Sequence, residues 1–423
     1  MKIKGFNHFH AHYSLFHHDI SEYMDGGSNL SDAQLEFLKQ KPSAGEKDVS
    51  NILIEILKEN LDGIQNHEIG LTLTGGFDSR VVLSALLALG KTPICFTYGN
   101  PQNRDIKIAS KICKKFDLKH INVASIPAES ESYLRDAKET LRIDQGNSHL
   151  HRSHRMLAIK QFTAKNNIKV LFTGHFGGEQ IRGLVYNNYF SSSLFEQFNE
   201  NDVKTLDLIE PILKSYFIRD DYYNKEQLIN EIMNLSWMKN NTANNRLYYL
   251  YDLVGMNHHM QDIRLYSKFV AKVIPVYLDK RFIEVLMKSP HHFMRKKRNR
   301  LNSLSHPKLY YSIIDRFCPE LLKIELSNRY KPTDYAKGLV FYAMKRVINK
   351  YLVTTHTPPS FSYGAWYVKF IKDNAERVDE CIWEIYDKKA YFHALNNATH
   401  ESNEGYWHKF SNPIFFDLKN KSI

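Results

Sequence analysis

The sequence predicts an α/β fold built on a doubly wound parallel sheet, with a helical C-terminal portion. Short apolar segments alternate with segments of helical length between residues 48 and 174. Two of the short segments run directly into glycine-rich turns. Because strands that alternate with helices form a parallel sheet covered on both faces, these observations together indicate this fold class.

The first three elements are predicted from hydrophobic periodicity and their end signals. Residues 48–63 form an amphipathic helix, with Val49, Ile52 and Ile56 near one face. Residues 67–74, HEIGLTLT, are short, apolar and β-branched, which is typical of a buried strand. Residues 80–90 are rich in Leu and Ala and end at a glycine, which indicates a helix with a glycine stop.

Three further strands are predicted over residues 92–99, 119–125 and 167–174. A helix over 104–116 separates the first two, and two helical stretches precede the last. Beyond about residue 190 the strand pattern fades, and the sequence becomes helical and rich in Tyr and Phe. The glycine-rich segments therefore fall at the carboxyl ends of parallel strands, where such sheets bind ligands.

The turn after the first strand, LTLTGGFDSR, has the composition of a phosphate-binding site. Gly75 and Gly76 expose backbone at the start of a helix, where free N–H groups and the helix dipole favour an anion. Ser79 adds a hydroxyl donor. Asp78 would repel a bare phosphate, so its carboxylate predicts a Mg²⁺ between the two. A packing turn is the alternative interpretation.

Composition and charge narrow the class of protein. Hydrophobic residues make up 43% and charged residues 24% of the 423 residues, as in ordinary globular proteins. Four scattered cysteines without a CxxC pair indicate a reducing compartment and no zinc ribbon. The net charge of +11 permits nucleic-acid partners, but we interpret the basic run at 295–300 as a solvated surface, so we expect none. We find no signal peptide or membrane-spanning run, so we expect a cytoplasmic protein with no membrane partner.

The motif TGGFDS resembles the SGGxDS pyrophosphate loop of ATP pyrophosphatases, with Thr74 in place of the first Ser. The order of TGGFDS, FTYG and TGHFGGE is similar to that in the synthetase domain of asparagine synthetases and their relatives. Weaker similarities lie at Val273–Pro290 and at Lys331. The resemblance implies an adenine nucleotide α-hydrolase-like fold of the ATP pyrophosphatase type. It also implies ATP and Mg²⁺ as cofactors, with ATP split between the α- and β-phosphates.

The resemblance also implies how the nucleotide lies. Leu73 and Tyr98 would lie along the adenosine, and Thr173 and Gly174 near the ribose or α-phosphate. The residues expected to bind the nucleotide are Leu73, Thr74, Gly75, Gly76, Phe77, Asp78, Ser79, Tyr98, Thr173 and Gly174.

Three residues are predicted to be catalytic: Asp78, Glu179 and Lys331. By resemblance, Asp78 would bind Mg²⁺ and Lys331 would neutralise the charge that develops at the α-phosphate. The family has a second metal-binding Asp where this chain has Gly178. We therefore predict Glu179 as the second Mg²⁺ ligand; an acid at a helix N-terminus is the alternative.

The resemblance covers residues 48 to 331 and suggests three parts. Residues 1–45 would form a short N-terminal segment, 46–200 the α/β domain, and 201–423 a helical part that completes the synthetase domain. No cysteine precedes Cys95, so a glutaminase domain with a cysteine nucleophile is not expected. The nucleophile would then be free ammonia, ammonia delivered by a separate protein, or an amine on the substrate.

These patterns predict an AMP-forming, ATP-dependent carbon–nitrogen ligase that adenylates a small-molecule or peptide carboxylate. His175 stands where asparagine synthetases have a Glu, so the acceptor side departs from the family more than the ATP side does. We therefore expect an acid other than aspartate. A tRNA-modifying ATP pyrophosphatase and a non-catalytic nucleotide-binding protein are the alternatives.

Overall fold

The fold is known from a computed structural model. It describes residues 32–99, 101–123, 130–146, 148, 150–183, 214–224, 227, 257–295, 307–327, 329–334, 337, 340–341, 344–345, 347–348, 363–398 and 404–422. Of the predicted N-terminal segment 1–45, only helix α2 (Asp32–Lys39) and the residues that follow it are among them.

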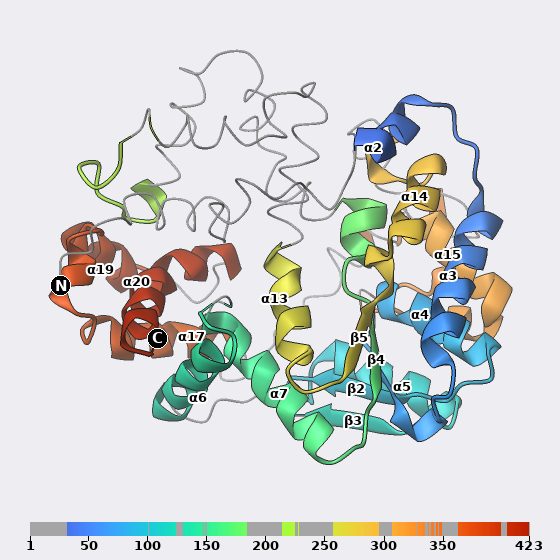
Figure 1. The fold of residues 1–423 in the computed structure, drawn as a ribbon, viewed down its shortest axis with the longest axis horizontal. Coiled ribbons are helices and arrows are strands. Elements are labelled where there is room, and N and C mark those ends of the chain that lie inside the picture. The colour runs from blue at the N-terminus through green and yellow to red at the C-terminus, as the bar shows by residue number, and fades with distance from the viewer. Residues whose placement is uncertain are drawn as a thin grey trace.

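Five parallel strands form one sheet (Figure 1). They are β1 (Ile69–Thr72), β2 (Ile94–Tyr98), β3 (His120–Val123), β4 (Val170–Thr173) and β5 (Lys272–Pro275). Their spatial order is β3-β2-β1-β4-β5, and every neighbouring pair is parallel. The chain leaves β1 toward β2 and β3 and returns on the other side at β4. This arrangement confirms the predicted α/β fold and makes the β1–β4 gap the topological switch point, where such sheets bind ligands.

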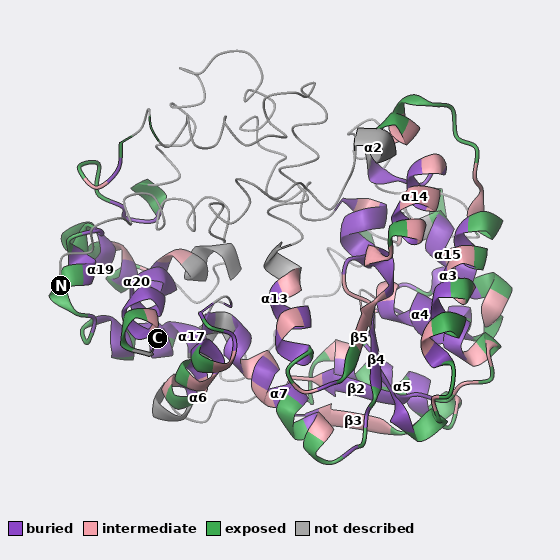
Figure 2. Cartoon of the chain, in the orientation of Figure 1, coloured by how far each residue is buried: buried purple, intermediate pink, exposed green. Residues whose placement is uncertain are grey.

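Helices cover both faces of the sheet, as alternating side chains along the strands require. Val170 and Phe172 of β4 pack into a core with one group of helices, while Leu171 between them packs against α7 on the opposite face. Buried residues accordingly fill the central strands β2, β1 and β4 and the inner sides of the helices, while the edge strands β3 and β5 are mostly half-buried (Figure 2). The first group comprises α3 (Glu46–Leu61), α4 (Asp78–Ala88), α5 (Arg104–Lys115), α14 (Lys280–Lys288) and α15 (Pro307–Phe317). The opposite group comprises α7 (Ser153–Ala164) and α13 (Asn257–Tyr266).

Strand β5 is an element that the sequence analysis did not predict. It is four residues long, lies at the sheet edge, and has no fully buried residue. It also ends at a proline, so neither length nor periodicity distinguishes it from a loop. The pairing of Val170 to Thr173 with Lys272 to Pro275 nevertheless brings residues beyond position 201 into the sheet.

The C-terminal helices pack against α6 (Ser130–Ile143), which in turn packs against α7 (Figure 1). The ring of Tyr133 on α6 meets that of Phe370 at 4.8 Å, and Lys419 donates to the Gly146 carbonyl at 3.3 Å. These helices are α17 (Tyr363–Ala375), α18 (Glu380–Trp383), α19 (Lys388–Asn396) and α20 (Glu404–Ser422). Among the helices that the structure describes, none combines the length and apolar character needed to cross a membrane.

Short helical turns connect the larger elements. They are η2 (Asn66–Glu68), η3 (Leu150–Arg152), the π-helical η4 (Gly178–Arg182), η6 (Val276–Leu278), η7 (Phe293–Arg295), η9 (Pro319–Lys323) and η10 (Pro332–Asp334).

Candidate active site

The turn between β1 and α4 is held by its own side chains. The Thr74 N–H donates to Ser79 Oγ at 3.0 Å, and the two hydroxyl oxygens lie 3.2 Å apart. The Gly76 N–H points at Thr74 Oγ1 at 3.3 Å. Threonine in place of serine at position 74 therefore keeps the hydroxyl that closes this turn.

Asp105, at the start of α5, adds a partner that the sequence analysis did not foresee. Its Oδ1 accepts the Gly75 N–H at 3.0 Å. The free N–H groups expected from the sequence are thus partly engaged, because Thr74, Gly75 and Gly76 all donate to side chains. A phosphate that binds the Gly75 N–H has to replace this carboxylate. Any side chain at position 75 would meet Asp105 Oδ1 at 2.9 Å, which explains the glycine.

The loop after β4 packs directly on the N-terminus of α4. A Cβ on Gly174 would lie 2.5 Å from the Ser79 nitrogen, and one on Gly177 would lie 2.6 Å from Asp78 Oδ1. Both glycines are therefore needed for the two strand ends to meet. This contact brings together the two glycine-rich motifs, which are about a hundred residues apart in the sequence.

We expect Gly177→Ala to impair the site through this contact. The added methyl group has to push the Asp78 carboxylate aside, which should lower the free energy of unfolding by about 1–3 kcal/mol. ATP–pyrophosphate exchange should fall about a hundredfold, because small misplacements of a reacting group have effects of that size. Gly45→Ala is the matched control, since its Cβ would meet nothing closer than 3.9 Å. Equal exchange rates in both variants would contradict this account of Gly177.

Asp78, Glu179 and Arg182 form a charged cluster beside this loop. Arg182 Nη2 lies 3.4 Å from Asp78 Oδ2, and Glu179 is almost fully buried in the η4 turn. Burial raises the pKa of Asp78, while the Arg182 guanidinium opposes this rise and the Glu179 carboxylate adds to it. The two predicted metal ligands are thus close enough to influence each other's charge.

Two tyrosines and a phenylalanine pack beside the cluster and hold its backbone. Tyr277 donates its hydroxyl to the Asp78 carbonyl at 2.8 Å, and Tyr310 donates to the Gly177 carbonyl at 2.9 Å. The Phe77 ring stacks on Tyr310 with centroids 5.1 Å apart. The sequence analysis missed both tyrosines as site residues. Tyr277 lies within Val273–Pro290, which resembles the family weakly, whereas Tyr310 carries no sequence signal.

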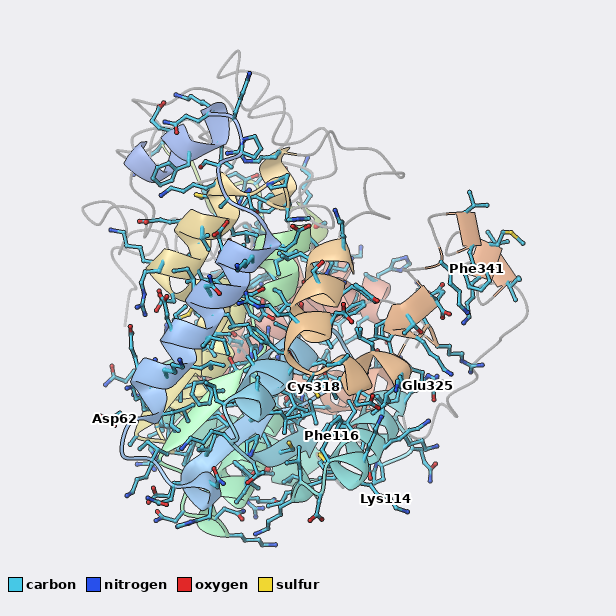
Figure 3. All side chains as sticks on the ribbon, turned by 90° about the vertical axis from the view of Figure 1, so that its right-hand side faces the viewer. Asp62, Lys114, Phe116, Cys318, Glu325 and Phe341 are labelled. Atoms are coloured by element: carbon cyan, nitrogen blue, oxygen red, sulfur yellow. The ribbon has the colours of Figure 1, made fainter. Side chains whose placement is uncertain are left out.

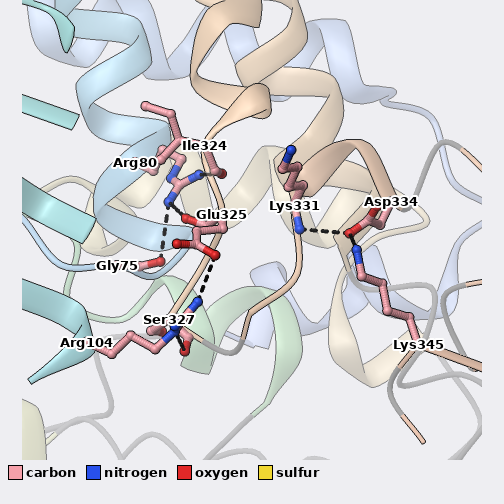
Figure 4. Close-up of polar contacts among 9 residues, drawn as sticks. All are labelled: Gly75, Arg80, Arg104, Ile324, Glu325, Ser327, Lys331, Asp334 and Lys345. Atoms are coloured by element: carbon pink, nitrogen blue, oxygen red, sulfur yellow. Dashed lines mark hydrogen bonds and ion pairs between the residues drawn. The ribbon is translucent and has the colours of Figure 1, made fainter. Parts of the chain in front are cut away.

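Arg80 ties the loop to the segment 321–325 (Figure 4). Its side chain is fully buried and donates to the carbonyls of Ile324 at 2.7 Å and Glu325 at 2.9 Å. It also donates to the carbonyls of Leu321 at 3.1 Å and Gly75 at 3.4 Å. Burial lowers the pKa of Arg80 to about 10, so it stays charged at neutral pH. The sequence places Arg80 at the start of an apolar helix, but in the structure its buried side chain joins the β1–α4 turn to the segment 321–325.

The same segment, which includes the Glu325 labelled in Figure 3, is bound to Arg104 of α5, and Figure 4 shows the contacts. Arg104 pairs with Glu325 at 2.9 Å and donates to the Ser327 carbonyl at 2.8 Å. The Ser327 N–H donates to the Gly75 carbonyl at 3.1 Å. Residues 325–327, which lie about 250 positions beyond the loop in the sequence, therefore form one wall of the candidate site.

Lys331 lies on this wall, but its ammonium group does not reach the loop. The residue is exposed, and its backbone N–H donates to Asp334 Oδ2 at 2.9 Å. Its side chain does not point toward Gly75 (Figure 4) and pairs with no described carboxylate. The backbone near Lys331 thus lies close to the site, but the ammonium group of Lys331 does not point into it.

The remaining predicted residues lie around the strand ends. Leu73 is buried and donates its N–H to the Phe96 carbonyl at 2.8 Å, and Tyr98 ends β2. Thr173 ends β4 and is fully buried, and its Oγ1 has no hydrogen-bond partner among the described residues. A hydroxyl of this kind beside the switch point is suited to a ligand group.

His175 belongs to a second charged cluster, built on the buried Asp262 of α13. Asp262 Oδ2 pairs with His175 Nε2 at 3.3 Å and with Arg152 at 3.0 Å, and it also contacts Arg155. The Arg155 guanidinium lies 5.8 Å from the centre of the Tyr98 ring. The position at which the resemblance places an acidic residue is therefore part of a network of mixed charge.

The carboxylates fit a divalent cation in their chemistry. Asp78 Oδ1 is buried and has no hydrogen-bond partner in the described part of the chain, as expected of an oxygen that awaits a ligand. No group of three or more His, Cys, Asp or Glu converges in the described part of the chain, at this cluster or at any other place. Two carboxylates alone are the usual protein share of a Mg²⁺ site completed by phosphates and water.

Comparison with known proteins agrees with these features. The family described as asparagine synthase matches residues 53–301, more than half of the chain. No curated protein matches the chain significantly.

Proposed function

The chain belongs to the asparagine synthase family of ATP-dependent amide-forming ligases, and we propose that it adenylates a carboxylate and transfers the acyl group to ammonia or an amine. Pyrophosphate leaves when the carboxylate oxygen attacks the α-phosphorus. AMP leaves when the nitrogen attacks the acyl carbon. The observation that best supports this is the packing of the Gly174–Gly177 loop on the Thr74–Ser79 turn, with Asp78 between them.

In this proposal the β1–α4 turn holds the phosphates. Ser79 and the backbone of Gly75 and Gly76 surround them, at the positive end of the α4 dipole. Mg²⁺, when bound, would neutralise the phosphates between Asp78 and Glu179. The mutual proximity of the two carboxylates supports this assignment.

The nucleoside would lie along the ends of β2 and β4. Leu73 and Tyr98 would line the adenosine, while Thr173 and Gly174 would approach the ribose or α-phosphate. The buried Thr173 hydroxyl, which has no described partner, supports this placement. Lys331 would act at the α-phosphate only after a movement of its side chain, since it is exposed and directed elsewhere.

The acceptor would be a small-molecule or peptide carboxylate. His175 and its charged partners around Asp262 make this side of the site polar. The nucleophile would be ammonia, free or delivered by a separate protein, or an amine on the substrate. A tRNA-modifying pyrophosphatase is less well supported, because Arg295 of the basic run is bound to the Met287 carbonyl at 2.7 Å and to the Gln40 carbonyl at 2.7 Å.

The test is incubation with ATP, Mg²⁺, ammonium and a library of carboxylic acids, read by mass spectrometry. AMP together with a new amide supports the proposal and identifies the acceptor. Pyrophosphate release that depends on added tRNA would instead favour the modifying enzyme. No pyrophosphate release with any acid or RNA would favour a non-catalytic nucleotide-binding protein.

We expect Glu179→Gln to raise the Mg²⁺ concentration needed for half-maximal activity by about tenfold or more, a typical effect of weakening a metal site. The carboxamide keeps the shape of the buried side chain but removes its charge. Activity is measured as AMP release across a Mg²⁺ titration. Glu36→Gln is the control, because Glu36 is an exposed residue of α2 that pairs with Lys39. An unchanged Mg²⁺ dependence would leave Glu179 as a structural acid of the η4 turn.

A further inference from the structure

Arg182 is the one charged side chain of the cluster that neither the sequence analysis nor the proposed function uses. It is the last residue of η4, and its guanidinium carbon lies 5.7 Å from the centre of the Tyr310 ring. Its Nη2 lies 3.4 Å from Asp78 Oδ2. Gly183 follows at φ +60°, and a Cβ there would meet the Phe293 ring at 2.6 Å. The end of the turn that carries Arg182 is therefore held in place.

Arg182 changes the charge of the site. Asp78 and Glu179 together carry −2 when both are ionised, so one Mg²⁺ alone would leave the protein side of the site neutral. With Arg182 included, the same single ion leaves the site positive, which suits a triphosphate and its leaving pyrophosphate.

The guanidinium is suited to phosphate oxygens as well as to Asp78. Burial lowers the pKa of Arg182, but Tyr310, Asp78 and Glu179 together outweigh it and raise the pKa, so the side chain remains charged. A guanidinium has five N–H donors in a planar fork, a geometry that matches phosphate oxygens as well as carboxylate oxygens. About a third of the side chain is exposed, so a ligand in the site can reach it.

We propose that Arg182 is a built-in cation of the pyrophosphate site. In the nucleotide-free protein it neutralises Asp78, and in the ATP complex its guanidinium donates to β- or γ-phosphate oxygens. This inference rests on the proposed function, because it assumes that the β1–α4 turn holds the phosphates. It makes Arg182 a substrate-contacting residue that stabilises the leaving pyrophosphate.

The test measures binding of inorganic pyrophosphate in EDTA, with AMP as the reference ligand, by titration calorimetry. Without metal, the guanidinium should supply much of the attraction. Arg182→Gln should therefore weaken pyrophosphate binding about tenfold or more, as expected for a charge-assisted phosphate contact, while AMP affinity stays the same. Arg182→Lys should retain part of the affinity, since it keeps the charge but loses the fork. Arg316→Gln is the control, because Arg316 is exposed and, among the described residues, donates to the Lys47 carbonyl and to Asn51 on α3.

Unchanged or tighter pyrophosphate binding by Arg182→Gln would overturn the inference. Arg182 would then serve to hold the Asp78 carboxylate in place and would not bind phosphate. If Arg182→Gln loses AMP binding as well, Arg182→Lys decides: weaker pyrophosphate binding with AMP binding retained supports the inference, and equal binding overturns it. Failure of the wild-type protein to bind AMP or pyrophosphate both in EDTA and with Mg²⁺ restored would overturn the proposed function itself.

Discussion

Asp78→Asn is expected to lower ATP–pyrophosphate exchange by about a thousandfold, equivalent to about 4 kcal/mol of transition-state stabilisation. The substitution keeps the shape of the side chain and removes the charge of a metal ligand. Its Oδ1 is the buried oxygen that has no hydrogen-bond partner in the described part of the chain. The loss should therefore appear in the chemical step.

The fold of this variant should be intact. Burial raises the pKa of Asp78, which means that the folded protein bears a cost for the ionised form. Removing that charge should leave the melting temperature unchanged or raise it, although Arg182 loses its partner. Asp221→Asn is the control, since Asp221 is exposed and pairs with Arg219. Exchange at a near wild-type rate would show that Asp78 does not bind the metal.

Arg80→Met is expected to lower the free energy of unfolding by about 3–5 kcal/mol, because several buried carbonyls would lose a charged hydrogen-bond donor at once. The methionine fills much of the same volume but donates no hydrogen bonds. The carbonyls of Leu321, Ile324 and Glu325 would then be buried without their donor. Urea denaturation followed by circular dichroism measures the change.

Activity should fall with stability in this variant, because Arg80 also holds the Gly75 carbonyl. Arg316→Met is the matched control, since Arg316 is an exposed arginine on α15 that donates to the Lys47 carbonyl and to Asn51. A loss of less than about 1 kcal/mol in Arg80→Met, similar to a surface substitution, would show that the segment 321–325 does not depend on this side chain.

Local sequence patterns determined the fold class and the phosphate-loop candidate. The strands at Leu71, Phe96 and Phe172 are short apolar runs bounded by turn residues, so the apolar run and the flanking turn residues suffice to place them. Their parallel pairing follows from the helices between them. The glycines at positions 75 and 174 carry a signal of the same local kind, because only glycine permits the close approaches seen there.

Elements without such a local signal could not be predicted. Strand β5 is an edge strand stabilised by pairing with β4 rather than by a buried face of its own. Tyr310 lies on an amphipathic helix, where an inward-facing tyrosine is expected whether or not its hydroxyl reaches Gly177. The prediction of Lys331 rests on a motif, and a motif does not fix the direction of a long, exposed side chain.

The sequence by itself determined a parallel α/β sheet with two glycine-rich strand ends and the carboxylates Asp78 and Glu179 beside them. The tertiary structure alone decided which charges accompany those carboxylates. Arg182 reaches Asp78 across about a hundred residues, and Arg80 fastens its loop to carbonyls about 240 residues away. Such contacts leave no periodicity in the chain, because they depend on where separate elements meet in space and on the low-polarity surroundings that strengthen a charge interaction there.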